Sequence, residues 1–410
     1  MTEGKREKKY KKLRTAADLE RLMTRHYTIG KFVGRFKPVA WVTSGAPVEI
    51  LRAMDIFPIY PENYGALCGA RLAAVPLAQV AEAQGYSPDL CSYARSNLGS
   101  VFDAKNAPLG GLPRPHLLIC CNNICSTVVK WYEALAAHYN IPLFVLDTPF
   151  LHDGLADHTV HYVLAQFREM VAFLEHHTRR TLHLRKLSET IELANRAIVL
   201  WGEIRALCKA KPSPLNAPDL FVNMAPIVVL RGTKEAVGFY KKLKAEVEER
   251  VECGISALPE ERYRLLWDNI AIWHHLFRFY RYFVDYGACF VVDTYTGAWS
   301  TQIQWNEPLE SLARAYTTVF LNQSLEYRTE LTIRLLNEYE VDGFVMHCNR
   351  SCKPYSLGQY AIKAELTART GLPGFILESD MCDYRAHADE PTRTRIQTFM
   401  EALTTRVGRG

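Results

Sequence analysis

Residues 117–133 read LLICCNNICSTVVKWYE, and this stretch carries the clearest signature of the fold. It begins with a short apolar run, passes through the connection NNI and continues as an amphipathic pattern. A buried strand followed closely by an amphipathic helix is typical of a parallel sheet that helices cover on both faces. The stretch therefore predicts an α/β fold, and it places three thiols, Cys120, Cys121 and Cys125, within six positions of the strand and its connection.

The same alternation recurs along the chain. Strand patterns lie at 37–44 (KPVAWVTS) and 142–147 (PLFVLD), and further strand patterns follow at 288–295, 343–348 and 374–379. Between them, from about 156 to 255, the pattern is mainly helical. We therefore expect two parallel-sheet Rossmann/flavodoxin-like domains, with a helical intervening segment and a helical N-terminal region.

These patterns also predict a division of the chain. The expected parts are a basic tail with an N-terminal helix (1–36), a first α/β domain (37–155), a mainly helical connecting region (156–260) and a second α/β domain (261–410).

Composition excludes several classes of protein. The chain has 410 residues, of which 48% are hydrophobic, so it can bury large cores in two or three domains. Its apolar runs fall short of the roughly 18 to 20 residues of a membrane span, and its Lys-rich N-terminus lacks the apolar segment of a secretory signal. We expect a cytoplasmic protein without membrane contact. In that reducing compartment its 11 cysteines serve as buried side chains or metal ligands rather than as disulfides.

The positive charge is confined to one end of the chain. Residues 1–14, MTEGKREKKYKKLR, carry seven basic and two acidic side chains, which equals the whole net charge of +5. The remaining body is formally neutral, so nucleic-acid binding is not expected. We interpret the basic block as a solvated, mobile tail, the alternative being an electrostatic contact with an acidic partner or a polyanion.

Familiar small-molecule motifs are absent from the sequence. It contains no G-x-G-x-x-G turn after a strand, no Walker A lysine loop, no H-E-x-x-H helix and no G-x-S-x-G elbow. Nucleotide binding and serine hydrolysis are therefore not indicated, and the chemistry is sought among the cysteines.

Three cysteines share an expected environment. Cys91 lies in SPDLCSYARSNLG, where Ser87 is expected to cap a helix and Pro88 to occupy its first position. Cys125 and Cys352 each follow an expected strand through a three-residue connection and precede a helix. A helix N-terminus favours the thiolate, and open α/β sheets place their sites at the carboxyl ends of strands.

Ordinary packing is the alternative for each of these thiols, because buried free cysteine is common. Cys120 and Cys121 point to opposite faces of one strand, so at most one of them can join Cys125 at a site. Spacing alone leaves an iron–sulfur site and a zinc site both open.

Several motifs, in the same order, resemble a known family. They are YPEN (60–63), DLCSYAR, CCNNIC followed by KWYE, and NRSCKPYSLGQY. With them the chain resembles the 2-hydroxyacyl-CoA dehydratases and benzoyl-CoA reductases, in particular the larger-type subunit of the dehydratase heterodimer. The resemblance extends from about Trp41 to Leu403 and leaves the basic tail outside it.

The resemblance implies a cofactor and a reaction. Members bind one [4Fe-4S] cluster per subunit through three cysteines, a role that the motifs carry to Cys91, Cys125 and Cys352. Three ligands leave one iron open to substrate or water. In the family, one-electron reduction turns the thioester of an acyl-CoA into a ketyl radical, which eliminates water to give the 2-enoyl-CoA. The implied partners are a second homologous dehydratase subunit and an ATP-dependent iron–sulfur activator protein.

Polar residues near the expected cluster are candidates for proton transfer. Glu62 in YPEN and Ser44 in WVTSGAP match positions that face the substrate in the family, and a partly buried carboxylate there can act as acid or base. A helix cap for Glu62 and a turn for Ser44 are the alternatives. His347 and Arg350 flank Cys352, and each has either a role at the cluster or substrate or a purely structural one.

The family contains more than one activity. Benzoyl-CoA reductases have related subunits and similar cysteines, but they leave the electrons in the aromatic ring. The loops around Cys125 and Cys352 look closer to those of dehydratases. A non-catalytic assembly subunit that only carries a cluster is a further alternative, which retention of all three candidate ligands disfavours.

Overall fold

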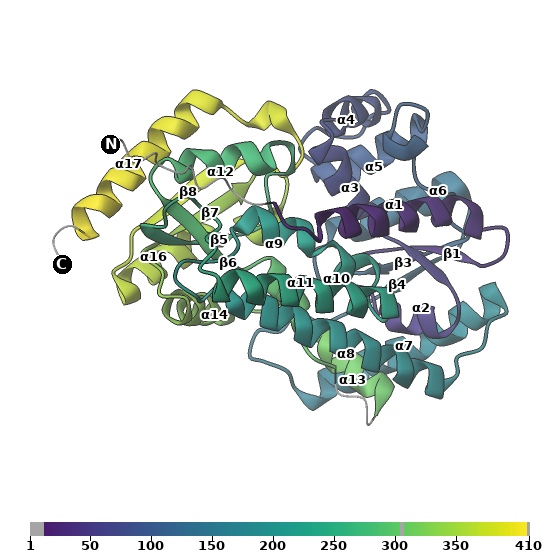
Figure 1. Ribbon diagram of the computed structural model, residues 1–410. Coiled ribbons are helices and arrows are strands. Elements are labelled where there is room, and N and C mark those ends of the chain that lie inside the picture. The colour runs from purple at the N-terminus through teal and green to yellow at the C-terminus, as the bar shows by residue number, and fades with distance from the viewer. Residues whose placement is uncertain (1–11, 304–306, 408–410) are drawn as a thin grey trace.

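The computed structural model describes residues 12–303 and 307–407, and it contains two four-stranded parallel sheets (Figure 1). In the first, the strand order is β2-β1-β3-β4, with β1 at Val39–Val42, β2 at Phe57–Ile59, β3 at Leu117–Cys121 and β4 at Leu143–Leu146. In the second, the order is β6-β5-β7-β8, with β5 at Tyr263–Asp268, β6 at Ala288–Asp293, β7 at Gly343–Asn349 and β8 at Gly374–Ser379. The predicted α/β class with two parallel sheets is confirmed. The residue boundaries of the predicted domains stay a prediction.

The strand β3 separates two cores. All five of its residues are buried, as a central strand covered on both faces requires. Cys120 packs into one core with Trp131 of the following helix, and Cys121 packs into the other with Phe167 of a later helix. The two thiols therefore point to opposite faces of the sheet, as the alternation of a strand predicts.

Helices cover both sheets and link them. The first sheet is accompanied by α2 (Val48–Ala53), α3 (Pro61–Ala70), α4 (Ala74–Ala83), α5 (Ser92–Phe102) and α6 (Thr127–Tyr139). The helical segment comprises α7 (Asp157–Thr178), α8 (Leu184–Leu207), α9 (Ala217–Asn223), α10 (Ala225–Val229) and α11 (Lys234–Glu252). The second sheet is accompanied by α12 (Leu276–Val284), α14 (Leu325–Glu338), α15 (Lys353–Ser356), α16 (Gln359–Thr370) and α17 (Asp389–Val407), whereas α13 (Pro308–Thr317) packs on α7 and α8.

Two strands were missed by the sequence patterns. β2 is a three-residue edge strand that contains Pro58, a position where the missing N–H of proline does no harm. β5 is internal to the second sheet, but it begins YRLL, and Arg264 interrupts its apolar run. The Arg264 guanidinium is buried and donates to the backbone carbonyls of Cys208 and Tyr339, which satisfies the charge inside the fold.

The N-terminal residues correct one prediction. Residues 1–11 lie outside the described part of the chain, but residues 12–14 do not form a solvated tail. Leu13 is buried, and the backbone N–H of Arg14 donates to Glu246 of α11 at 2.6 Å. The net charge of residues 1–14 does not reveal this contact, because it depends on Leu13, a single apolar residue in a segment that is mostly basic.

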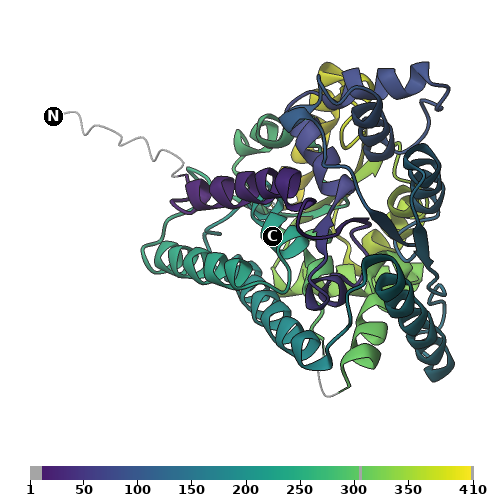
Figure 2. The same cartoon turned by 90° about the vertical axis from the view of Figure 1, so that its right-hand side faces the viewer.

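The helix α1 (Ala16–Val33) continues from this anchor and lies beside the helical segment (Figure 2). Lys242 of α11 pairs with Asp18 of α1 at 3.1 Å. Within the described residues, no helix is both long and apolar enough to cross a membrane.

Side chains from the first sheet domain hold the second in place. Arg95 of α5 is buried, and its guanidinium pairs with Glu82 at 2.7 Å and with Asp383, beyond β8, at 2.9 Å. The indole N–H of Trp273 donates to the Tyr93 hydroxyl at 2.5 Å. These contacts fix the two sheets in one relative position, with α5 at the junction.

Candidate active site

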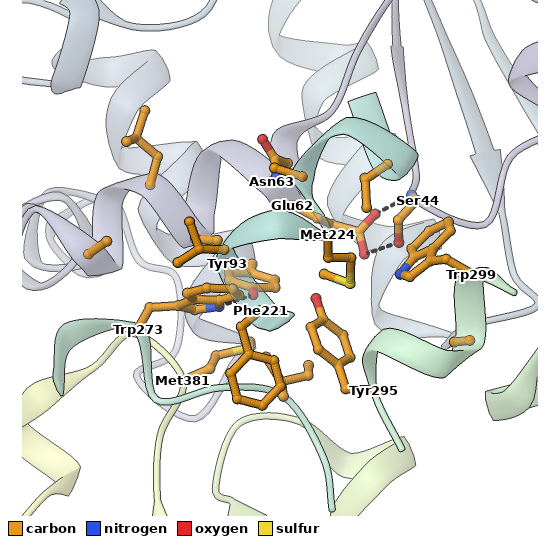
Figure 3. A pocket seen from close by; sticks show the side chains of 18 of the residues that line it. Ser44, Glu62, Asn63, Tyr93, Phe221, Met224, Trp273, Tyr295, Trp299 and Met381 are labelled. Carbon is orange, nitrogen blue, oxygen red and sulfur yellow. Dashed lines mark hydrogen bonds between the residues drawn. The ribbon is translucent and has the colours of Figure 1, made fainter. Parts of the chain in front are cut away.

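A cavity of about 850 Å³ lies between the two sheet domains, since residues from both line it. Most of its wall is apolar or aromatic. Figure 3 labels Phe221, Met224, Trp273, Tyr295, Trp299 and Met381 in this wall. Such a space favours an apolar ligand and excludes water from polar groups that project into it.

The three candidate cysteines all line this cavity. Cys91 is the N-cap residue of α5, Cys352 is the N-cap residue of α15, and Cys125 lies two residues before α6 begins. Their sequence positions span the chain, and the docking of the two sheets brings them to one space. The structure thus groups these three thiols together and leaves Cys120 and Cys121 in the cores behind them.

The start of α5 differs from the expected one. Ser87 does not cap this helix; its hydroxyl oxygen accepts a hydrogen bond from the Asp89 N–H at 3.2 Å within a turn, and the helix begins only at Ser92. Cys91 is consequently the N-cap residue of α5 and not a member of its first turn. Its side chain therefore lies at the end of the helix where the backbone N–H groups have no partner within the helix.

Backbone N–H groups at the three helix starts point to the sulfur atoms. Those of Tyr93 and Ala94 donate to Cys91, those of Thr127 and Val128 donate to Cys125, and that of Tyr355 donates to Cys352. Thiolate ligands of iron–sulfur clusters accept hydrogen bonds of this kind, which tune the cluster potential.

Burial nevertheless dominates the protonation of these thiols. It raises the pKa of Cys125 to about 11 and that of Cys352 to about 12, and it raises the pKa of Cys91 well above the ordinary value. The helix N-termini act in the expected direction, since their N–H groups lower each pKa, but burial raises each pKa further. Ionisation of all three thiols needs a compensating positive charge in the cavity.

The spacing of the sulfur atoms distinguishes between kinds of metal site. Two sulfur ligands of one tetrahedral zinc ion lie about 3.8 Å apart, as bonds of about 2.3 Å require. In the described part of the chain, the three candidate sulfurs do not all lie within 4.8 Å of one another. As they are placed, the three thiols are therefore too far apart to be ligands of a single ion.

Glu62 and Ser44 form a hydrogen-bonded pair on the cavity wall (Figure 3). The Ser44 N–H donates to one carboxylate oxygen of Glu62 at 2.5 Å, and the Ser44 hydroxyl donates to the other at 2.9 Å. Burial raises the pKa of Glu62 to about 7, although both hydrogen bonds from Ser44 lower it. A carboxyl group with this pKa can accept or release a proton near neutral pH.

The local structure explains this pairing. Ser44 follows β1, and Glu62 lies in the first turn of α3, whose N-cap residue is Tyr60. The Glu62 side chain does not cap its own helix, because Ser44 holds both of its oxygens. Ser44 does lie in a turn, which the hydrogen bond from the Ala46 N–H to the Thr43 carbonyl oxygen closes at 3.0 Å, so the turn alternative holds alongside its place on the cavity wall. The cap alternative does not fit Glu62.

Tyr295 is a cavity residue that the sequence reasoning missed. It follows β6, and its pKa is raised first by burial and then by the charge of Glu62, so the two side chains are neighbours. Figure 3 shows its hydroxyl directed into the space between them. Tyr295 is the last residue of the strand pattern 288–295, where an aromatic side chain is usually interpreted as part of the core.

Two flanking residues lie elsewhere. The His347 ring packs against Trp267, its Nδ1 lies 2.7 Å from the Ile270 carbonyl oxygen, and burial lowers its pKa to about 4. Arg350 is exposed. Neither residue lines the cavity, so the structural alternative fits both.

Comparisons with known proteins show the family of this chain. Residues 43–403 match the family described as 2-hydroxyglutaryl-CoA dehydratase, D-component. The chain is 35% identical over 373 residues to the (R)-2-hydroxyisocaproyl-CoA dehydratase alpha subunit of Clostridioides difficile, covering 90% of this chain and 91% of the relative. It is 34% identical over 381 residues to the lactoyl-CoA dehydratase subunit alpha of Anaerotignum propionicum, covering 89% and 90%.

A more distant relative belongs to the ring reductases. A benzoyl-CoA reductase subunit of Thauera aromatica is 27% identical over 385 residues, covering 90% of this chain and 89% of the relative. The predicted resemblance to dehydratases and benzoyl-CoA reductases is thereby confirmed. The chain belongs to the 2-hydroxyglutaryl-CoA dehydratase D-component family and is an enzyme subunit of that family.

Proposed function

We propose that this chain is the [4Fe-4S]-bearing subunit of a radical 2-hydroxyacyl-CoA dehydratase, with Cys91, Cys125 and Cys352 as the cluster ligands. The observation that carries the proposal is that these three thiols face one cavity together with the Glu62–Ser44 pair. Their N–H donors and their spacing, too wide for one ion, support a cluster.

A cluster bound by these three cysteines would offer an open iron position and would lend one electron to a bound thioester; the electron would return after loss of water, so that formation of the 2-enoyl-CoA is redox-neutral. The protein has three tasks beside it. The apolar wall excludes water from the reacting end of the acyl group and fits an aliphatic or aromatic chain. Glu62, with a pKa of about 7, exchanges a proton with the substrate. Ser44 holds the carboxylate in position through both of its hydrogen bonds.

The proposal includes partners. The relatives at 35% and 34% identity are each called an alpha subunit, so their enzymes contain at least one further subunit. We infer a second homologous dehydratase subunit for this chain as well, together with an ATP-dependent iron–sulfur activator protein as the electron source.

The runner-up function is reduction of an aromatic ring, as the name of the benzoyl-CoA reductase relative suggests. Three dehydratase subunits, at 35%, 34% and 32% identity, are more similar to the chain than the benzoyl-CoA reductase subunit at 27%, which favours dehydration, while a fourth dehydratase subunit is 26% identical. A single assay separates the two. The chain, its second subunit and the activator are incubated anoxically with ATP and either a 2-hydroxyacyl-CoA or benzoyl-CoA, and the products are identified by mass spectrometry.

Formation of a 2-enoyl-CoA supports the proposal, and formation of a cyclic dienoyl-CoA supports the runner-up. Consumption of neither substrate by a preparation with full iron content indicates a non-catalytic, cluster-bearing role and overturns both.

A further inference from the structure

A second group of potential metal ligands lies outside the cavity. Asp389 begins α17, His275 precedes α12, and His387 lies two residues before Asp389. One ligand atom from each lies within 4.8 Å of the other two, the one such group of His, Cys, Asp and Glu in residues 12–303 and 307–407. None of the three lines the cavity, so the group is separate from the site described above.

The distances in this group match those around a small ion. The Nε2 atom of His387 lies 3.1 Å from Oδ1 of Asp389, and the Nε2 atom of His275 lies 3.5 Å from the same oxygen. Two nitrogen or oxygen ligands of a tetrahedral ion, with bonds of about 2.0 to 2.1 Å, lie about 3.3 Å apart. These two separations lie on either side of this value, and the two histidine ligand atoms lie within 4.8 Å of each other, so the group can close around one ion.

One atom of the group lacks a partner. Nε2 of His275 is buried, and apart from its contact with Asp389 at 3.5 Å it forms no hydrogen bond within the described residues, which is costly for a ring nitrogen. A metal ion would satisfy it. The opposite ring nitrogen of His387 lies 3.2 Å from the Ser379 hydroxyl, and such a contact is what orients a metal-binding imidazole.

We propose that His275, His387 and Asp389 bind a divalent transition-metal ion of the zinc class, with water as the fourth ligand. Imidazole and carboxylate groups suit such an ion. On binding, the proton of His387 resides on Nδ1 and is donated to the Ser379 hydroxyl, which leaves Nε2 free to coordinate.

The ion would act as a structural staple. It would join α17 to the start of α12, two helices that lie side by side in Figure 1. Trp273, Leu276 and Phe277, immediately around His275, line the cavity. Bound metal would therefore fix part of the cavity wall without contact to the reacting groups.

Zinc binding to the cluster-loaded protein tests this proposal. Untagged wild-type protein with full iron content is incubated anoxically with Zn²⁺ and passed over a desalting column, and zinc is measured by elemental analysis. We expect about one retained zinc per chain. Zinc-edge X-ray absorption is expected to show only nitrogen and oxygen neighbours at about 2.0 to 2.1 Å, without sulfur at about 2.3 Å.

Three variants and one control accompany it. His275→Ala, His387→Ala and Asp389→Asn are expected to lose at least nine tenths of the retained zinc, whereas His183→Ala, at an exposed histidine in the helical segment, is expected to keep it. Asp389→Asn preserves size and lies in a partly exposed first turn, so it serves where an alanine variant fails to fold. Zinc is also expected to raise the thermal midpoint of wild-type protein and of the control, but not that of the three variants.

The proposal is overturned if the wild-type protein retains no zinc, if sulfur appears in the zinc shell, or if Asp389→Asn binds zinc as the wild-type protein does. Each result is independent of whether the protein dehydrates an acyl-CoA.

Discussion

The backbone N–H of Ser92 donates a hydrogen bond to the hydroxyl oxygen of Ser351 at 3.1 Å. These residues are the neighbours of Cys91 and Cys352, and they belong to different sheet domains. The Ser351 hydroxyl in turn donates to the Asp380 carboxylate after β8. The bond therefore ties two candidate ligand loops together.

Replacing Ser351 with alanine should loosen the site. The change leaves the buried Ser92 N–H without its acceptor, which costs about 1 to 3 kcal/mol. We expect a lower thermal midpoint and faster loss of iron to a chelator. Ser96→Ala is the matched control. Ser96 lies in α5, as Ser92 does, and its buried hydroxyl donates to the Tyr93 carbonyl oxygen within that helix. Equal iron loss from both variants would contradict a role for Ser351 in joining the loops.

The pH dependence of activity should report Glu62. Its pKa of about 7 places one limb of the kcat/KM profile near neutral pH, and Glu62→Gln should abolish that limb along with most of the activity. Ser44→Ala removes a hydrogen bond that stabilises the carboxylate, so the pKa of Glu62 rises and the limb moves to higher pH. We expect a movement of about one pH unit, from a charge-assisted bond of about 1.5 kcal/mol.

The direction of this movement is the same whether Glu62 acts as acid or as base. A limb that stays in place, or moves to lower pH, in the Ser44→Ala enzyme would show that another group titrates. Thr43→Ala is not a suitable control, since its hydroxyl accepts from the Cys121 N–H inside the sheet.

Truncation should divide the N-terminal segment into two parts. Deletion of residues 1–11 is expected to leave iron content and thermal stability unchanged. Deletion of residues 1–14 also removes Leu13, whose burial contributes about 2 kcal/mol, and Arg14, which pairs with Glu246 and Glu249. We expect only this longer deletion to lower the thermal midpoint. Equal thermal midpoints for the two truncated proteins would show that residues 12–14 add no stability, and would support the interpretation of residues 1–14 as a solvated tail.

Local patterns in the sequence predicted much of this architecture. The sequence around Cys125 encodes strand, connection and helix start within 17 residues, so the sheet and the approximate start of α6 were predictable, although the N-cap residue is Ser126. The candidate ligands could be named because each precedes a helix in the local sequence pattern, and the family resemblance selected these three cysteines from the others.

Contacts between distant segments were not predictable in this way. Convergence of the three thiols depends on docking through Arg95, which in the sequence reads as one more surface arginine. β5 was missed because a buried Arg264 breaks its apolar run. Burial of the thiols raises their pKa despite the helix N-termini, and burial is a property of the assembled fold rather than of the helix that each one precedes.

The most direct test of the account measures iron and acid-labile sulfide per chain in five cysteine variants, prepared and reconstituted anoxically. The wild-type protein is predicted to hold about four of each per chain of this type. Cys91→Ala, Cys125→Ala and Cys352→Ala are predicted to lose the cluster and the activity, because two thiolates hold a cubane poorly. Cys120→Ala and Cys121→Ala, which alter only the cores beside β3, are predicted to keep the iron at a cost of about 1 to 2 kcal/mol in stability. A full cluster in Cys125→Ala, together with its loss in Cys120→Ala or Cys121→Ala, would contradict the account.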